Sequence, residues 1–175
     1  DLDSTAIVLN GGTLRDAALN DVTVVLPSTT IADGSAIVID GTAPTIESIT
    51  SSTGDGTYGV GSGINVTVTF SEAVTLAGGT LDVTLDTGDV VAITAFGPSI
   101  TASGIYTAGS GDTSADLDST NIVLNGGTLR DAALNDVTVG LPSTTIADGS
   151  AIIIDGTAPT IESITSSTGD GTYGV

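Results

Sequence analysis

The chain repeats itself with a period of 115 residues, and this repeat limits its fold more than any other feature. Residues 1–60 and 116–175 align without a gap. They differ at only three pairs of positions: Ala6/Asn121, Val25/Gly140 and Val38/Ile153. A period of this length is too long for a solenoid unit and matches the size of a small domain. The sequence therefore predicts a tandem array of domain-sized modules.

A proline-containing joint sets the expected module boundaries. The segment IDGTAPTI occurs at 39–46 and again at 154–161. Its proline fixes φ and cannot donate to a β-ladder, so strand pairing is interrupted there. We therefore place boundaries after Asp40 and Asp155. On this basis the chain is a window on a longer array: residues 1–40 are the closing strands of one repeat, 41–155 one complete repeat, and 156–175 the first strand of the next.

Apolar and polar residues alternate along several short segments. INVTVTF (64–70), TLDVTLD (80–86) and DVTVGLP (136–142) all show this period of two, which is typical of half-buried strands. Clusters of Gly, Asp, Asn and Ser separate them, which predicts an all-β antiparallel sandwich or barrel without a long helix. The side chains that we expect in the core are Val66, Val68, Phe70, Leu81, Val83, Ile122, Leu124, Val137 and Val139.

Charge and composition narrow the classes of partner. Two arginines against twenty-one acidic residues give a net charge of −19, which disfavours nucleic acid and anionic membranes as partners. The absence of Cys and His removes disulfides and the usual ligands of zinc and copper. The apolar runs are much shorter than the roughly 20 residues that a membrane helix needs. Divalent cations that prefer oxygen ligands are the expected partners, and membrane insertion is not expected.

Strands that alternate in direction from the joint would gather acidic residues at two poles of the module. Calcium takes six to eight oxygen ligands, which either group could supply, although Asp and Asn also favour turns without any metal. The near pole would collect Asp40, Glu72, Asp131, Asn135 and Asp136. The far pole would collect Asp55, Asp86, Asp89, Asp112, Asp116 and Asp118, with Asp155 at its exit. The loop DTSADLD (112–118) is the second candidate for calcium after the near pole.

Three segments together resemble a known family. DGTAPTI, VTVTFSEAVT, and LNGGTLRDAALNDVTV with its closing AIIID are similar to the bacterial immunoglobulin-like repeats of giant secreted surface adhesins and fibres. The resemblance covers the whole 115-residue period. It implies immunoglobulin-like β-sandwiches stacked end to end outside the cell, at the bacterial surface. It also implies calcium at the joints, where the Asp of an Asp-x-Thr-x-Pro linker is a ligand, a role that falls to Asp40 and Asp155.

Motifs for catalysis are weak. G-x-G-x-x-G at Gly54, Gly56 and Gly59 lacks the following helix or the lysine of nucleotide-binding sites, and Asp-Thr-Gly at 86–88 occurs once where an aspartic protease needs two. We therefore expect no enzyme. Near-identical neighbouring repeats favour a structural spacer. The alternative is a module that binds a glycan or a partner surface, which should show an aromatic-lined groove.

Overall fold

The computed structural model describes all 175 residues, which divide into two units, residues 1–42 and 43–175. The first unit holds one short helix, α1 (Ile31–Gly34), and one isolated bridge between Arg15 and Asp21. Almost all of its side chains are exposed. The second unit contains every strand and the hydrophobic core.

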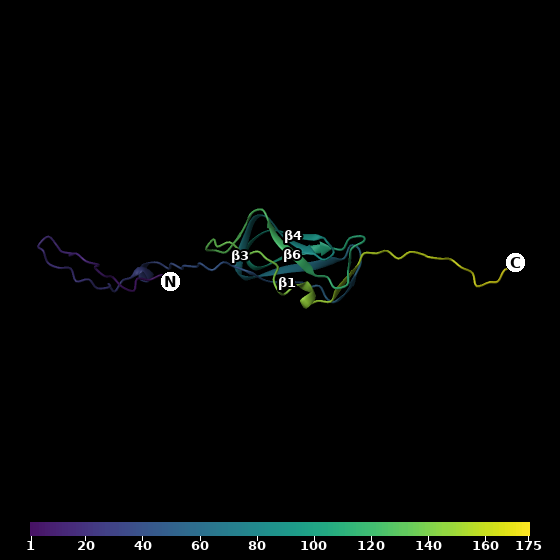
Figure 1. The fold of residues 1–175 in the computed structure, drawn as a ribbon, viewed down its shortest axis with the longest axis horizontal. Coiled ribbons are helices and arrows are strands. Elements are labelled where there is room, and N and C mark those ends of the chain that lie inside the picture. Colours follow the sequence, from purple (N-terminus) through teal and green to yellow (C-terminus); the bar gives the residue numbers. More distant parts are fainter. The chain divides into compact units, whose positions relative to one another are not determined.

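The second unit is built from β-strands with a single 3-10 turn, which confirms the all-β prediction. Antiparallel pairs dominate, and the one parallel strand pair joins β2 to β8. Figure 1 labels four of the strands, β1, β3, β4 and β6, all within the second unit. The 3-10 turn is η1 (Ile146–Asp148). The strands are β1 (Ile46–Thr50), β2 (Gly56–Tyr58), β3 (Gly63–Leu85), β4 (Val90–Thr107), β5 (Thr113–Ser114), β6 (Ser119–Asn125), β7 (Thr128–Arg130) and β8 (Ile152–Asp155).

The β3–β4 hairpin is the largest part of the fold, and it is bent back on itself. Its register shifts repeatedly between Thr69 and Thr80, as bulges do where a strand bends. Gly104 faces Val91 so closely that a Cβ would lie 2.5 Å from a Val91 methyl. One hairpin therefore supplies strand segments that pack face to face.

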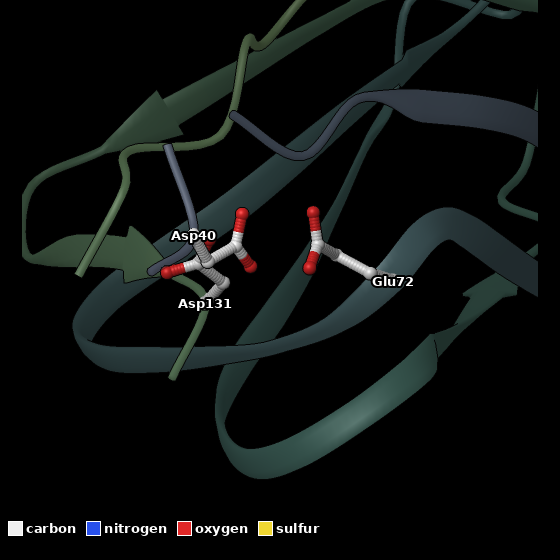
Figure 2. A group of neighbouring side chains, drawn as sticks. All are labelled: Asp40, Glu72 and Asp131. Atoms are coloured by element: carbon white, nitrogen blue, oxygen red, sulfur yellow. The ribbon is translucent and has the colours of Figure 1, made fainter. Parts of the chain in front are cut away.

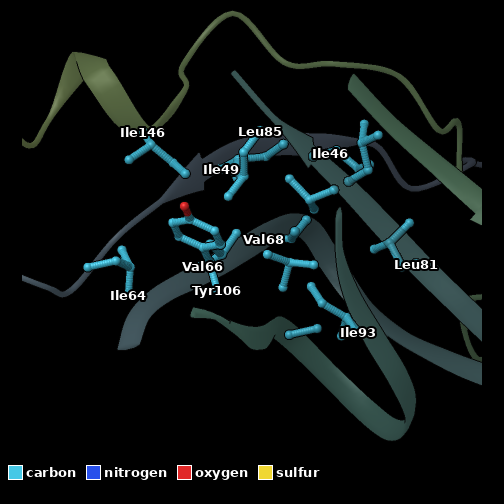
Figure 3. Packing of buried hydrophobic residues seen from close by; sticks show 14 of the residues in the cluster. Ile46, Ile49, Ile64, Val66, Val68, Leu81, Leu85, Ile93, Tyr106 and Ile146 are labelled. Carbon is cyan, nitrogen blue, oxygen red and sulfur yellow. The ribbon is translucent and has the colours of Figure 1, made fainter. Parts of the chain in front are cut away.

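The remaining strands complete two sheets around one core. Strands β1, β6 and β7 pair with β3, whereas β2, β8 and β5 form a separate sheet. One cluster of buried side chains includes residues of both sheets. Figure 3 shows the part of it that β1, β3 and β4 contribute, together with Ile146 of η1. Leu124 and Val139 are partly buried and pack against it. The other side chains predicted for the core are buried: Val66, Val68, Phe70, Leu81, Val83, Ile122 and Val137.

The segment 136–142 departs from the strand that its alternation predicts. It forms only isolated bridges, to Arg130 and Thr45, and Leu141 is exposed. Gly140 and Pro142 explain this ending, because glycine weakens a strand and proline cannot donate to a ladder. The segment GDGTYG shows the opposite departure. It contains strand β2, which pairs with β8 although turn residues dominate its sequence.

Candidate metal centre

A six-residue loop after β7 fixes the position of Asp131. The Asp131 carboxylate accepts hydrogen bonds from the backbone N–H and the side-chain amide of Asn135, both at 2.8 Å. Leu134 adopts a left-handed conformation with φ of 70°, which lets the chain turn back. The Arg130 guanidinium then closes the loop on Asp136 at 2.5 Å.

The same loop occurs in the first repeat copy, so its geometry is encoded locally. Asp16 accepts hydrogen bonds from the backbone and side-chain nitrogens of Asn20, both at 2.9 Å. Leu19 has φ of 69°, and Arg15 pairs with Asp21. Because residues 1–42 bury almost nothing, these contacts do not depend on the core. The sequence RDAALND therefore specifies a preformed carboxylate turn.

Burial and hydrogen bonding shift the pKa of the Asp131 carboxyl group in opposite directions. Only 6% of the residue is exposed, and burial by itself raises the pKa of its carboxyl group. Hydrogen bonds from Asn135 and from the backbone N–H groups of Ala133 and Leu134 more than offset this effect, so the pKa lies below its ordinary value. Asp131 is therefore a buried carboxylate that stays ionised at neutral pH.

Strand β3 places Glu72 beside the segment that enters the second unit. The Ser71 N–H donates to the Thr45 carbonyl at 3.0 Å, and the Thr45 N–H donates to the Ser71 hydroxyl at 3.0 Å. Glu72 follows directly and is half-buried. These paired contacts join residues 26 positions apart, and no local pattern predicts them.

Asp40, Glu72 and Asp131 each offer a carboxylate oxygen, and these oxygens lie within 4.8 Å of one another. In Figure 2 Glu72 points toward the carboxylates of Asp40 and Asp131. Two oxygens that share an ion at about 2.4 Å can be separated by at most about 4.8 Å. The group therefore has the spacing that a shared divalent cation requires. Three of the five residues predicted for the near pole thus form a group that could hold a metal ion.

Comparisons with known proteins identify no relative. No protein-family model matches this chain, and no curated protein or solved structure is significantly similar to it. The case for a cation therefore depends on the donors themselves. All three are carboxylate oxygens, which suit hard ions such as calcium or magnesium rather than zinc or copper. None of the helical segments has the length and the apolar composition of a transmembrane span.

The other residues predicted near the joint take part in hydrogen bonds. Asn135 uses its amide N–H to hold Asp131. Asp136 is bonded to Arg130, whose hydrogen bond lowers the pKa of that carboxyl group. Asp155 accepts a hydrogen bond from the Thr157 N–H at 3.0 Å, the same contact that Asp40 makes with Thr42. Asn135 thus positions a ligand, and Asp155 repeats the local geometry of Asp40.

The far-pole residues Asp112, Asp116 and Asp118 do not form a comparable group. Asp112 accepts hydrogen bonds from the Tyr106 hydroxyl at 2.7 Å and the Gly109 N–H at 2.5 Å, and its pKa is lowered chiefly by the first. Asp118 accepts from backbone N–H groups, whereas the Asp116 side chain is exposed. Asp112 and Asp118 therefore serve as acceptors for neighbouring turns.

Proposed function

We propose that this chain is a structural spacer, built from tandem immunoglobulin-like β-sandwich repeats, in an extracellular adhesin or fibre of a bacterial surface. The observation that carries the proposal is the group formed by Asp40, Glu72 and Asp131. Asp40 ends one repeat in the sequence, and the other two residues belong to the next. An acidic group with this composition is suited to control a joint between repeats.

Calcium is the cation that we propose for this joint. Residues 41–155 carry thirteen acidic side chains against one arginine, a net charge of −12 per repeat. Neighbouring repeats with this charge repel one another, and monovalent salt screens the repulsion only diffusely. A divalent ion bound by several carboxylates would cancel the repulsion locally and would tie the linker residue Asp40 to β3 and to the Asp131 loop. The expected result is a stiffer joint.

A ligand-binding module is the alternative function. A hollow on the surface has a volume of about 460 Å³ and is lined by residues within 93–103. Phe96 is its only aromatic side chain. That ring stacks on Phe70, with centroids 6.1 Å apart, so part of its surface is already covered. Glycan sites usually offer free aromatic faces, and this hollow therefore favours the spacer over the glycan-binding alternative.

Small-angle scattering tests the proposal on a polypeptide of four consecutive repeats. When calcium replaces chelator, the maximum dimension of the four-repeat polypeptide should increase. The distribution of maximum dimensions should become narrower. Replacing Glu72 with Gln in every repeat should abolish the change, while the same change at the exposed Glu47 should preserve it. A scattering profile that is the same with calcium and with chelator would contradict the proposed role of calcium. Specific binding to a glycan panel would instead support the alternative.

A further inference from the structure

Strand β4 has an outer edge that no other strand of this chain occupies, because β4 pairs only with β3. Strands β1 and β6 pair with the opposite side of β3. The outer edge of β1 is covered, since the Ile49 N–H donates to the Thr144 carbonyl at 3.0 Å. Strand β6 has 7 residues, whereas β4 has 18. The outer edge of β4 is therefore the longest open edge of the sheet.

The register between β3 and β4 decides which backbone groups of β4 face outward. The Ala108 N–H donates to the Ser62 carbonyl at 2.9 Å, one step beyond the pair formed by Gly63 and Thr107. Hydrogen-bonded and non-hydrogen-bonded pairs alternate along an antiparallel ladder, so residues 102, 104 and 106 bond to β3. The backbone N–H and C=O groups of the intervening residues point away from β3, namely those of Thr101, Ser103, Ile105 and Thr107.

Three of these four residues keep their outward backbone groups free. Thr101 does not, because its carbonyl accepts a hydrogen bond from the Ser99 hydroxyl at 2.7 Å and its N–H donates to the same oxygen at 3.1 Å. The outward groups of Ser103, Ile105 and Thr107 have no backbone partner in the chain. Ile105 is the middle one, and it is 62% exposed. Such a row of free groups is a template for another strand.

The β4 edge is neutral in an otherwise acidic protein. Residues 90–111 contain no charged side chain, and this is the longest uncharged run in a chain of net charge −19. Exposed edges are usually protected by charged side chains, above all Lys, or by proline, and residues 101–107 contain neither. A basic partner would be attracted to the acidic loops rather than to this edge. A second β4 edge fits better, because the two strands meet without bringing carboxylates together.

We infer that β4 is a self-pairing edge, at which residues 103–107 of two copies of this chain pair antiparallel with Ile105 opposite Ile105. Ser103 of each copy then faces Thr107 of the other, and the free backbone groups of both strands are satisfied. The two exposed isoleucine side chains come into contact across the pair. Because the same surface is used by both copies, the contact is closed by two-fold symmetry and produces a dimer.

The pairing follows from the fold and charge of the second unit, and it requires neither calcium nor the spacer role. It has a consequence that does rest on the proposed function. In a tandem array the same edge would recur in every repeat, so weak contacts between two neighbouring arrays would add together. The β4 edge would then hold fibres side by side.

Sedimentation equilibrium of the whole chain in chelator tests the pairing. An interface of this size is weak, so protein concentrations up to about 1 mM are needed to populate the dimer. Dimerisation should strengthen as NaCl rises from about 50 to about 500 mM, because salt screens the repulsion between two acidic chains and the contact itself contains no ion pair. Hydrogen exchange at the N–H groups of Ser103 and Ile105 should slow as the protein concentration rises, whereas exchange within β6 should not change.

A pair of lysine variants tests where the contact lies. Ile105→Lys should weaken dimerisation about tenfold, because it removes the apolar contact and places two like charges opposite each other. Val123→Lys is the matched control, since Val123 is also apolar and 43% exposed but belongs to β6. Both variants reduce the net negative charge equally, so a difference between them cannot come from general repulsion. Val123→Lys should not weaken dimerisation.

Several results would overturn the inference. One is a chain that stays monomeric at the highest protein and salt concentrations, and another is equal weakening by the two lysine variants. Dimerisation that weakens as salt is added would indicate an ionic contact elsewhere on the chain. Exchange at Ser103 and Ile105 that is independent of protein concentration would also contradict the pairing. Chelator is present throughout, so none of these results bears on the calcium site, which the melting curves test separately.

Discussion

Gly127 lies against Gly78 so closely that a Cβ on Gly127 would overlap the Gly78 carbonyl oxygen. Both residues have positive φ, 69° and 72°, where glycine is favoured. The contact joins the turn between β6 and β7 to the bend within β3. The close approach allows β6 and β7 to pair with β3 of the long β3–β4 hairpin.

Replacing Gly127 with Ala should destabilise the second unit by at least about 3 kcal/mol, because the methyl group meets backbone that cannot move aside and the positive φ adds strain. Gly12 provides the matched control. It has φ of 74° but no atom within 4 Å of its added Cβ, so Gly12→Ala should leave the urea midpoint of the second unit unchanged. If Gly127→Ala and Gly12→Ala lowered the stability of the second unit equally, the close approach of Gly127 to Gly78 would not be the cause of the loss.

The two repeat copies allow a second matched comparison in the core. Leu129→Ala should cost about 2–5 kcal/mol, since it leaves a cavity among fully packed side chains. Leu14→Ala changes the same residue in the first copy, where the side chain is exposed, and should have no measurable effect on unfolding of the second unit. Urea unfolding followed by circular dichroism measures both. A loss of stability in Leu14→Ala would mean that residues 1–42 support the core.

Acid should destabilise the second unit through carboxylates whose pKa is lowered by folding, namely Asp131, Asp112 and Asp136. Such a group binds fewer protons when folded. Its contribution to stability is therefore present above the ordinary pKa of about 3.9 and is lost as the pH falls through the folded value. Urea unfolding in chelator between pH 7 and pH 3 should show this decline.

Asp131→Asn should reduce the slope of that decline. Asp16→Asn is the control, because hydrogen bonds from Asn20 also lower the pKa of Asp16, but its turn does not depend on the core. The Asp16→Asn variant should leave the pH dependence of the second unit's stability unchanged. Parallel curves for the unaltered chain and Asp131→Asn would exclude Asp131 as a source of the acid response.

Local sequence signals predicted much of this structure. The alternation in 64–70 and 80–86 places Val66 and Leu81 in the core, because a period of two fixes which face of a strand is buried. The repeat boundary and the alternating strand direction together predict that Asp40, Glu72 and Asp131 lie at one pole. These features depend on short-range pattern or on simple topology.

Features that depend on tertiary contacts could not be predicted in this way. The bend of β3 requires Gly78 and Gly79 to meet the turn at 126–127, and no spacing in the sequence indicates that contact. Strand β2 forms in a turn-like segment because β8 pairs with it. The hydrogen bond from Tyr106 to Asp112 likewise depends on packing, although the acidic loop suggested a metal ligand. The predicted module boundaries and the tandem arrangement remain predictions.

Calcium dependence of thermal unfolding tests the central claim most directly. Extracellular modules bind calcium with Kd of about 10⁻⁴–10⁻³ M, so 5 mM calcium should stabilise the second unit by about 1–2.3 kcal/mol, a rise in Tm of several degrees. Sodium at equal ionic strength should not reproduce the rise, and Glu72→Gln should reduce it while Glu47→Gln preserves it. Identical melting curves in chelator and in 5 mM calcium would contradict a calcium site formed by Asp40, Glu72 and Asp131.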